Sequence, residues 1–194
     1  MKRVMEKLNN GFFVPTYLLY TDWTNPTRKK ERETYHACIN NVFNATNAIQ
    51  SFTEIVRPDD LHTRYLLLYG VLQAFIIQQD GIDSLQRLFI EESARVKYTT
   101  LYPLWSEIRA LRRGAVGHPA ESNHRTITGI IGGSKEDWGV KVWIKDQPVT
   151  IRPYILSHLD AYEDEVLDAL EPIFIAMHNR AELGSRVMRG ESAE

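Results

Sequence analysis

The sequence predicts an all-α fold: a helical bundle with one β-hairpin inserted between its last two long helices. Apolar residues recur every three or four positions over most of the 194-residue chain, which is the period of a helix with one buried face. Only over residues 126–145 does the pattern change to β-forming residues that alternate with polar ones. We therefore expect one domain over residues 26–182, with an irregular arm over 1–25 before it and a polar tail over 183–194 after it.

Composition indicates an ordinary globular protein and excludes several classes. Hydrophobic residues make up 43% of the chain and charged residues 25%, so it is neither collagen-like nor wholly disordered. Cys38 is the only cysteine, so no disulfide can form within the chain and zinc sites built on cysteine clusters are excluded. No signal-peptide pattern is present, and the longest apolar run, residues 65–77, is shorter than the roughly 20 residues that cross a bilayer. We expect a cytoplasmic protein with no membrane segment.

The first long helix is expected to begin at Pro26 and to stop at Pro58. Asn25 before Pro26 has the form of an N-cap followed by proline at the first helical position. The residues that recur at helical steps are Tyr35, Ile39, Val42, Ala45, Ile49, Phe52 and Val56. The preceding residues 1–25 mix aromatic residues with turn formers and lack such a period, which favours the irregular arm.

A second helix is expected to follow, with Asp59 or Asp60 as its cap. It leaves little polar surface on any side, which is typical of a helix in the centre of a bundle. Its apolar residues are Leu61, Tyr65, Leu68, Leu72, Phe75 and Ile76. Gly81 and Asp83 are expected to restart a shorter helix through Phe89.

The next helix is expected to begin near Pro103, after a connection over residues 91–100. Its core stripe consists of Leu104, Ile108, Leu111 and Ala115. The helix should end at Gly117-His118-Pro119, because glycine supplies the left-handed C-terminal turn and proline cannot continue the helix.

The hairpin and the last helix complete the bundle. Val140, Val142 and Ile144 alternate with polar or aromatic neighbours after a Gly132-Gly133-Ser134 turn, which predicts the hairpin. The stripe of the last helix consists of Ile155, Leu159, Tyr162, Val166, Ala169, Ile173 and Met177. Pro172 should kink this helix, and the polar tail should follow near Gly184.

Several familiar catalytic motifs are absent from the sequence, among them HExxH, GxSxG and the glycine-rich phosphate loop. The segment 132–135 is best explained as the hairpin turn. His118, Glu121 and His124 could ligate a metal, but they fall in a predicted loop without a helical scaffold to fix their geometry. We therefore expect no metal and no cofactor.

One short segment, residues 109–125, is basic although the whole chain has a formal net charge of -2. Glu121 is its single carboxylate, against Arg109, Arg112, Arg113, His118, His124 and Arg125. Guanidinium groups bind phosphate oxygens bidentately, so a phosphate-bearing partner is the natural complement. The first three arginines are expected to share one side of their helix, roughly opposite its core stripe.

These residues are sufficient for metal-free cleavage of RNA. The 2′-hydroxyl can attack the adjacent phosphate if one group moves protons and another neutralises charge, and His118 and Arg112 supply the two roles. A structural interpretation stands beside this one, because basic residues near a helix C-terminus also complement the helix dipole. Similar Arg-to-His spacings occur at 57–62 and 152–158, where proline directly follows the arginine.

Residues 108–119 resemble the signature of the HEPN superfamily: an arginine, usually a polar residue next, and a histidine after four to six positions. The resemblance implies a small α-helical bundle that forms a homodimer, with the motifs of two protomers facing each other. It implies a metal-independent endoribonuclease, of the kind used as toxins or in phage defence, although other members are non-catalytic. Arg112 and His118 would be catalytic, with Arg113 in the polar position. Arg113 paired with His118 also satisfies the spacing.

Two functions are therefore expected from the sequence. The first is an RNA-cleaving homodimer, restrained or activated by an antitoxin or defence-complex partner, in which Arg109, Arg113, His124 and Arg125 bind the substrate. The alternative is a non-catalytic helical adaptor or sensor that binds a protein or a phosphorylated ligand. Arginine at 113 replaces the commoner asparagine or aspartate. Ala120 stands where the subgroup paired with nucleotidyltransferase antitoxins carries a tyrosine, so that form of inactivation is not expected.

Overall fold

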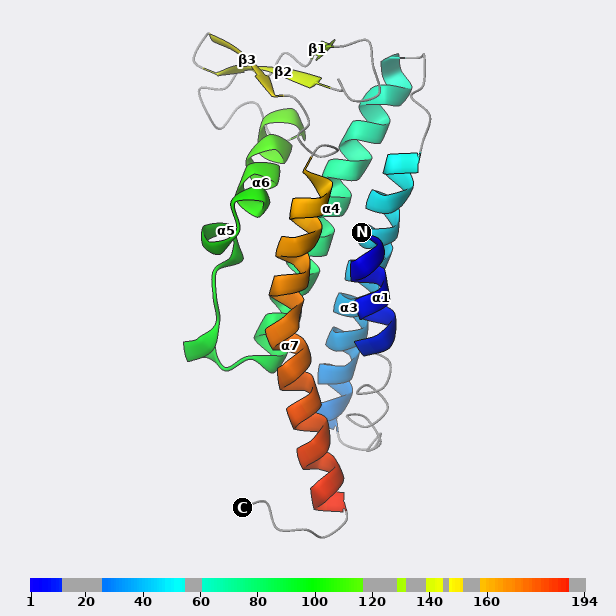
Figure 1. Ribbon diagram of the computed structural model, residues 1–194, viewed down its shortest axis with the longest axis vertical. Helices are drawn as coiled ribbons and strands as arrows, with labels where there is room; N and C mark the ends of the chain where they lie inside the picture. The colour runs from blue at the N-terminus through cyan, green and yellow to red at the C-terminus, as the bar shows by residue number, and fades with distance from the viewer. Residues whose placement is uncertain are drawn as a thin grey trace.

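The chain folds into a helical bundle, as the sequence predicts (Figure 1). The computed structural model describes residues 1–11, 26–54, 61–116, 129–131, 139–144, 147–151 and 158–188, the three strand segments by their backbone. The main helices are α1 (Lys2–Gly11), α3 (Pro26–Glu54), α4 (Leu61–Phe89), α6 (Pro103–Val116) and α7 (Leu159–Met188). A 3-10 turn, η1 (Glu92–Ala94), and a short helix, α5 (Tyr98–Leu101), connect α4 to α6. None of the described helices could span a membrane.

The core forms where the predicted apolar stripes meet. α4 lies against α3, α6 and α7, which agrees with its expected central position (Figure 1). Leu72 and Phe75 of α4 are fully buried, as are Val42 of α3 and Val166 of α7. Burial of large apolar side chains contributes roughly 1.5–3 kcal/mol each, so these contacts hold the helices together more strongly than helix propensity does.

Residues 61–89 form one continuous helix, so the expected restart at Gly81 is wrong. Gly81 instead allows α4 to approach α3 closely. A Cβ atom at this position would lie 2.7 Å from Val42 Cγ2 and 3.2 Å from the Cys38 carbonyl oxygen. Packing at this crossing therefore explains the glycine, and the roughly 1 kcal/mol that glycine costs in a helix does not break α4.

The irregular arm expected over residues 1–25 is wrong for residues 2–11, which form α1. Val4 and Leu8 lie one turn apart and are both buried, so this short segment has an apolar face of its own. α1 packs against α7 and α3. Its aromatic-rich continuation, residues 12–25, lies outside the described residues.

A buried ion pair anchors α1 to α7. The Met1 ammonium lies 2.6 Å from Glu163 Oε1, and the Glu163 side chain is only 6% exposed. Burial alone would raise the pKa of Glu163, but the Met1 ammonium, the Val4 N–H and Arg3 together hold that pKa below its ordinary value. Glu163 lies outside the predicted apolar stripe of the last helix, and it is buried because the N-terminal segment with α1 covers it.

The last helix extends past the predicted start of the polar tail. α7 runs through Gly184 to Met188, so residues 183–188 are helical and only 189–194 lie outside the description. No proline follows Gly184 to end the helix. α7 carries Pro172 within its length.

Three short strands lie between α6 and α7, at the end of the bundle where α4 begins (Figure 1). They are β1 (Gly129–Ile131), β2 (Gly139–Ile144) and β3 (Gln147–Ile151), and each pairs antiparallel with the next. β3 is not among the predicted strands, and it contains Pro148. β3 is an edge strand, where proline is tolerated. The predicted hairpin turn falls within residues 132–138, outside the described residues.

Candidate functional site

Two of the candidate arginines on α6 are held by polar side chains of α4. Arg109 Nη2 lies 2.5 Å from Asp80 Oδ1, and Arg112 Nη2 donates to Gln73 Oε1 at 3.4 Å. The two helices run in opposite directions, so the later arginine meets the earlier residue of α4. The side chains of Arg109 and Arg112 are half-buried, and these contacts orient each guanidinium toward α4.

Arg113 lies apart from this pair. It is exposed in the last turn of α6, where a cation is favoured by the partial negative charge of the helix end. The expectation that all three arginines lie opposite the core stripe is therefore wrong for Arg109 and Arg112. Trp105 explains the difference: it is buried at 1% exposure, and it lies about two turns before Arg112 on the same side of the helix.

Arg109 and Arg112 each retain an unused donor. The Nε atoms of both side chains are buried, and neither has a hydrogen-bond partner within the described part of the chain. Buried donors without an acceptor are uncommon in folded proteins. Both groups are therefore suited to an additional acceptor, such as an oxygen of a phosphate.

A buried polar network lies behind Arg109. Tyr162 Oη donates to Gln78 Oε1 at 2.9 Å, and Gln78 Nε2 donates to Thr46 Oγ1 at 2.7 Å. Burial raises the pKa of Tyr162, so its phenol stays protonated and acts as a donor. The network joins α3, α4 and α7 through Gln78, which lies on the other side of α4 from Asp80.

His118, the histidine of the predicted motif, lies outside the described residues. Residues 117–128, which include His118, His124 and Arg125, are not among the described residues, and neither is the rejected metal ligand Glu121. The structure therefore brings together Arg109 and Arg112 and separates Arg113. The roles of the two histidines and of Arg125 stay predictions.

Sequence reasoning missed the α4 residues that hold the arginines. Gln73 and Asp80 were not singled out in a helix that leaves little polar surface on any side. A usable signal was present, because a spacing of about two turns places them on one side of α4. Only the helix pairing shows that this side faces α6.

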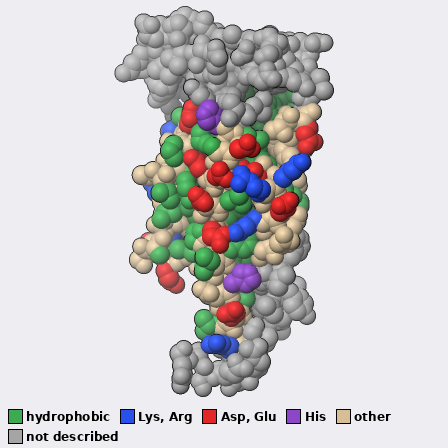
Figure 2. Space-filling view, viewed as in Figure 1, with side chains coloured by type: hydrophobic (Ala, Val, Ile, Leu, Met, Phe, Trp, Pro, Cys, Tyr) green, Lys and Arg blue, Asp and Glu red, His purple; other side chains and the backbone are tan. Residues whose placement is uncertain are grey.

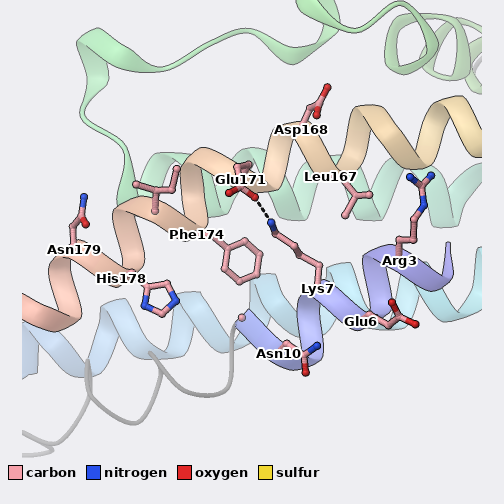
Figure 3. A pocket seen from close by; sticks show the side chains of 12 residues that line it. Arg3, Glu6, Lys7, Asn10, Leu167, Asp168, Glu171, Phe174, His178 and Asn179 are labelled. Carbon is pink, nitrogen blue, oxygen red and sulfur yellow. Dashed lines mark hydrogen bonds and ion pairs between the residues drawn. The ribbon is translucent and has the colours of Figure 1, made fainter.

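A large open groove lies between α1 and α7, with a volume of about 910 Å³ (Figure 3). Its cations are paired with carboxylates: Lys7 contacts Glu171, and Arg3 contacts Asp164 at 2.8 Å. Figure 2 shows this interspersion of basic and acidic side chains on the same face of the molecule. Such a balanced surface has no marked preference for an anionic ligand.

Comparisons with protein-family models, with characterised proteins and with solved structures found no match. Function is therefore inferred from the residues of this chain and their geometry.

Proposed function

We propose that this protein is a metal-independent endoribonuclease of the HEPN type, of the kind used as toxins or in phage defence. Arg112 and His118 of two copies would form its site. The observation that supports this most is the position of Arg112 near the C-terminal end of α6, half-buried and hydrogen-bonded to Gln73. An arginine held in this way gives a cation of defined direction just before the segment that carries His118.

The proposed reaction is an internal transfer of the phosphoryl group. The RNA 2′-oxygen attacks the adjacent phosphorus and loses its proton to His118 of one subunit, while the bond from phosphorus to the 5′-oxygen breaks. The leaving 5′-oxygen takes a proton from a second histidine, His118 of the partner subunit. The products are a 2′,3′-cyclic phosphate and a 5′-hydroxyl, so no metal or external nucleophile is required.

Arg112 would act on charge rather than on protons. Negative charge builds on the non-bridging phosphoryl oxygens as the 2′-oxygen attacks, and a guanidinium can donate two parallel hydrogen bonds to those oxygens. The half-buried side chain strengthens the interaction, because screening by water is reduced.

Incubation of the purified protein with RNA in the presence of EDTA tests the proposal. His118→Ala and Arg112→Ala are each expected to lower the cleavage rate about 10²-fold or more, which is typical for loss of a proton-transfer or charge-stabilising group. Arg113→Ala tests the alternative motif, in which Arg113 rather than Arg112 pairs with His118. An RNA with 2′-deoxyribose at the cleavage position should stay intact.

Matched control variants lie on α7, away from α6. His178→Ala and Arg186→Ala remove an exposed histidine and an exposed arginine, and both should retain wild-type activity. Far-UV circular dichroism confirms that each variant is folded. Equal cleavage by His118→Ala and the wild type would refute the site, and cleavage of the deoxy-substituted RNA would refute the chemistry.

A further inference from the structure

A second, smaller cavity lies on the α6 side of the bundle, bounded by the C-terminal half of α4, the connection that follows it and α6. Its volume is about 480 Å³, which is within the roughly 300–1,000 Å³ of small-molecule sites. Four cationic side chains line it, namely Arg87, Arg95, Lys97 and Arg109, against the single carboxylate of Asp83. Arg109 pairs with Asp80 just outside the lining and Arg87 with Asp83, so the excess positive charge comes from Arg95 and Lys97.

Unused hydrogen-bond donors add to the positive charge. Trp105 lines the cavity and is 1% exposed, yet its Nε1 has no acceptor among the described residues. The buried Nε of Arg109 also has no acceptor among the described residues. Both groups can only donate, so a ligand that satisfies them must bring acceptors.

The wall of the cavity is held in place by its own hydrogen bonds. Gln86 donates to the Val96 carbonyl at 3.1 Å and accepts from the Val96 N–H at 2.6 Å. Arg95 donates to the carbonyls of Ile90 and Arg87, both at 2.9 Å, which fixes the chain after α4. The connection is therefore a preformed wall, and Arg95 is partly occupied by this structural role.

Lys97 is the cation that remains available. Its side chain is exposed, and the described residues supply no hydrogen bond or ion pair to its ammonium group. Arg87, by contrast, lies 3.3 Å from Asp83, which competes with any incoming anion. The aromatic rings of Tyr98 and Trp105 are 2% and 1% exposed, so no ring surface is available to stack on a base.

We propose that the α4–α6 cavity binds the phosphate group of a small phosphorylated ligand. A phosphate supplies the negative charge that Arg95 and Lys97 lack, and several acceptor oxygens for the unused donors of Trp105 and Arg109. Recognition is of the phosphate rather than of the group that carries it, because the rings in the lining are covered. The cavity does not include Arg112, although it shares Arg109 with the residues predicted to bind RNA, so Lys97 is the residue that distinguishes the two sites.

Isothermal titration calorimetry at constant ionic strength tests the proposal with inorganic phosphate, AMP and adenosine. Inorganic phosphate, AMP or both are expected to bind saturably at one site, and adenosine is not. Lys97→Gln should weaken the phosphate affinity on the order of tenfold, as expected for loss of a charge-assisted hydrogen bond. Lys30→Gln, which removes an exposed lysine of α3, is the matched control and should change nothing.

Asp83→Asn provides a test by gain of binding, which a misfolded variant cannot imitate. Removal of the competing carboxylate should tighten phosphate binding on the order of threefold. The proposal is overturned if neither phosphate nor AMP binds saturably, if adenosine binds as well as AMP, or if Lys97→Gln and Asp83→Asn leave the affinity unchanged. Binding only of an RNA oligonucleotide without terminal phosphates would also overturn it and would assign the cavity to the RNA backbone.

Discussion

The close approach of α3 and α4 at Gly81 predicts opposite effects for two substitutions of the same type in one helix. Gly70 and Gly81 both lie inside α4. A Cβ at Gly70 would meet nothing within 4 Å, whereas one at Gly81 would lie 2.7 Å from Val42 Cγ2. Replacement of glycine by alanine stabilises a helix interior by about 1 kcal/mol when the new methyl group has room.

Gly70→Ala should therefore raise the free energy of unfolding by about 1 kcal/mol. Gly81→Ala gains the same helix propensity but forces a methyl group against a buried, β-branched side chain and a backbone carbonyl, neither of which can move easily. Such overpacking costs about 1–3 kcal/mol, so we expect a net loss of about 1 kcal/mol. The two variants should then differ by about 2 kcal/mol, or about 4–8 °C in Tm for a chain of this size.

Urea denaturation followed by far-UV circular dichroism measures both variants, and a double-mutant cycle identifies the cause. Val42→Ala removes the Cγ2 atom, so Gly81→Ala should be much less destabilising in that background, where only the contact with the Cys38 carbonyl remains. If Gly81→Ala stabilises the wild type as much as Gly70→Ala does, or if its effect is the same with and without Val42→Ala, the packing explanation is refuted.

Two further predictions concern buried polar contacts. Glu163→Gln removes the negative charge that compensates the buried Met1 ammonium and should lower the free energy of unfolding by about 3 kcal/mol at neutral pH. Because the folded-state pKa of Glu163 is lowered, its contribution is present above the ordinary value of 4.5 and is lost as the pH falls through the folded-state pKa, so unfolding curves of wild type and variant should converge in acid; a constant difference would contradict this. Tyr98→Phe removes the hydroxyl that donates to the Ala169 carbonyl at 3.1 Å and should cost about 1 kcal/mol by thermal denaturation, and an unchanged Tm would show that the bond contributes nothing.

The helices that the sequence predicted well are those whose signals are local. Pro26 and Pro103 begin α3 and α6 as expected, because proline fixes the backbone of the first helical turn. The stripes also hold: Val42, Ile49 and Val166 are fully buried, as their helical spacing predicted. The spacing of apolar residues along the chain determines which face of a helix is buried. That face can therefore be predicted without knowing which helix packs against it.

The candidate site was predictable only in part. The sequence singled out Arg109 and Arg112 by the local excess of positive charge, but it misplaced their side of the helix because the burial of Trp105 was not recognised. It did not single out Lys97, and it did not place Arg109 in the α4–α6 cavity. Lys97 lies in a connection and Arg109 on a helix, and nothing in a linear pattern brings them to the same cavity.

The sequence by itself thus determined the all-α class, the positions of the long helices and the basic segment at the end of α6. The tertiary structure decided that α4 continues through Gly81, that α1 is a helix docked on α7, and that Asp80 and Gln73 hold the arginines of α6. The physical reason is the range of the interactions. Helix period and proline geometry act over neighbouring residues, whereas a close helix crossing, an ion pair and a cavity each depend on residues that only the folded chain brings together.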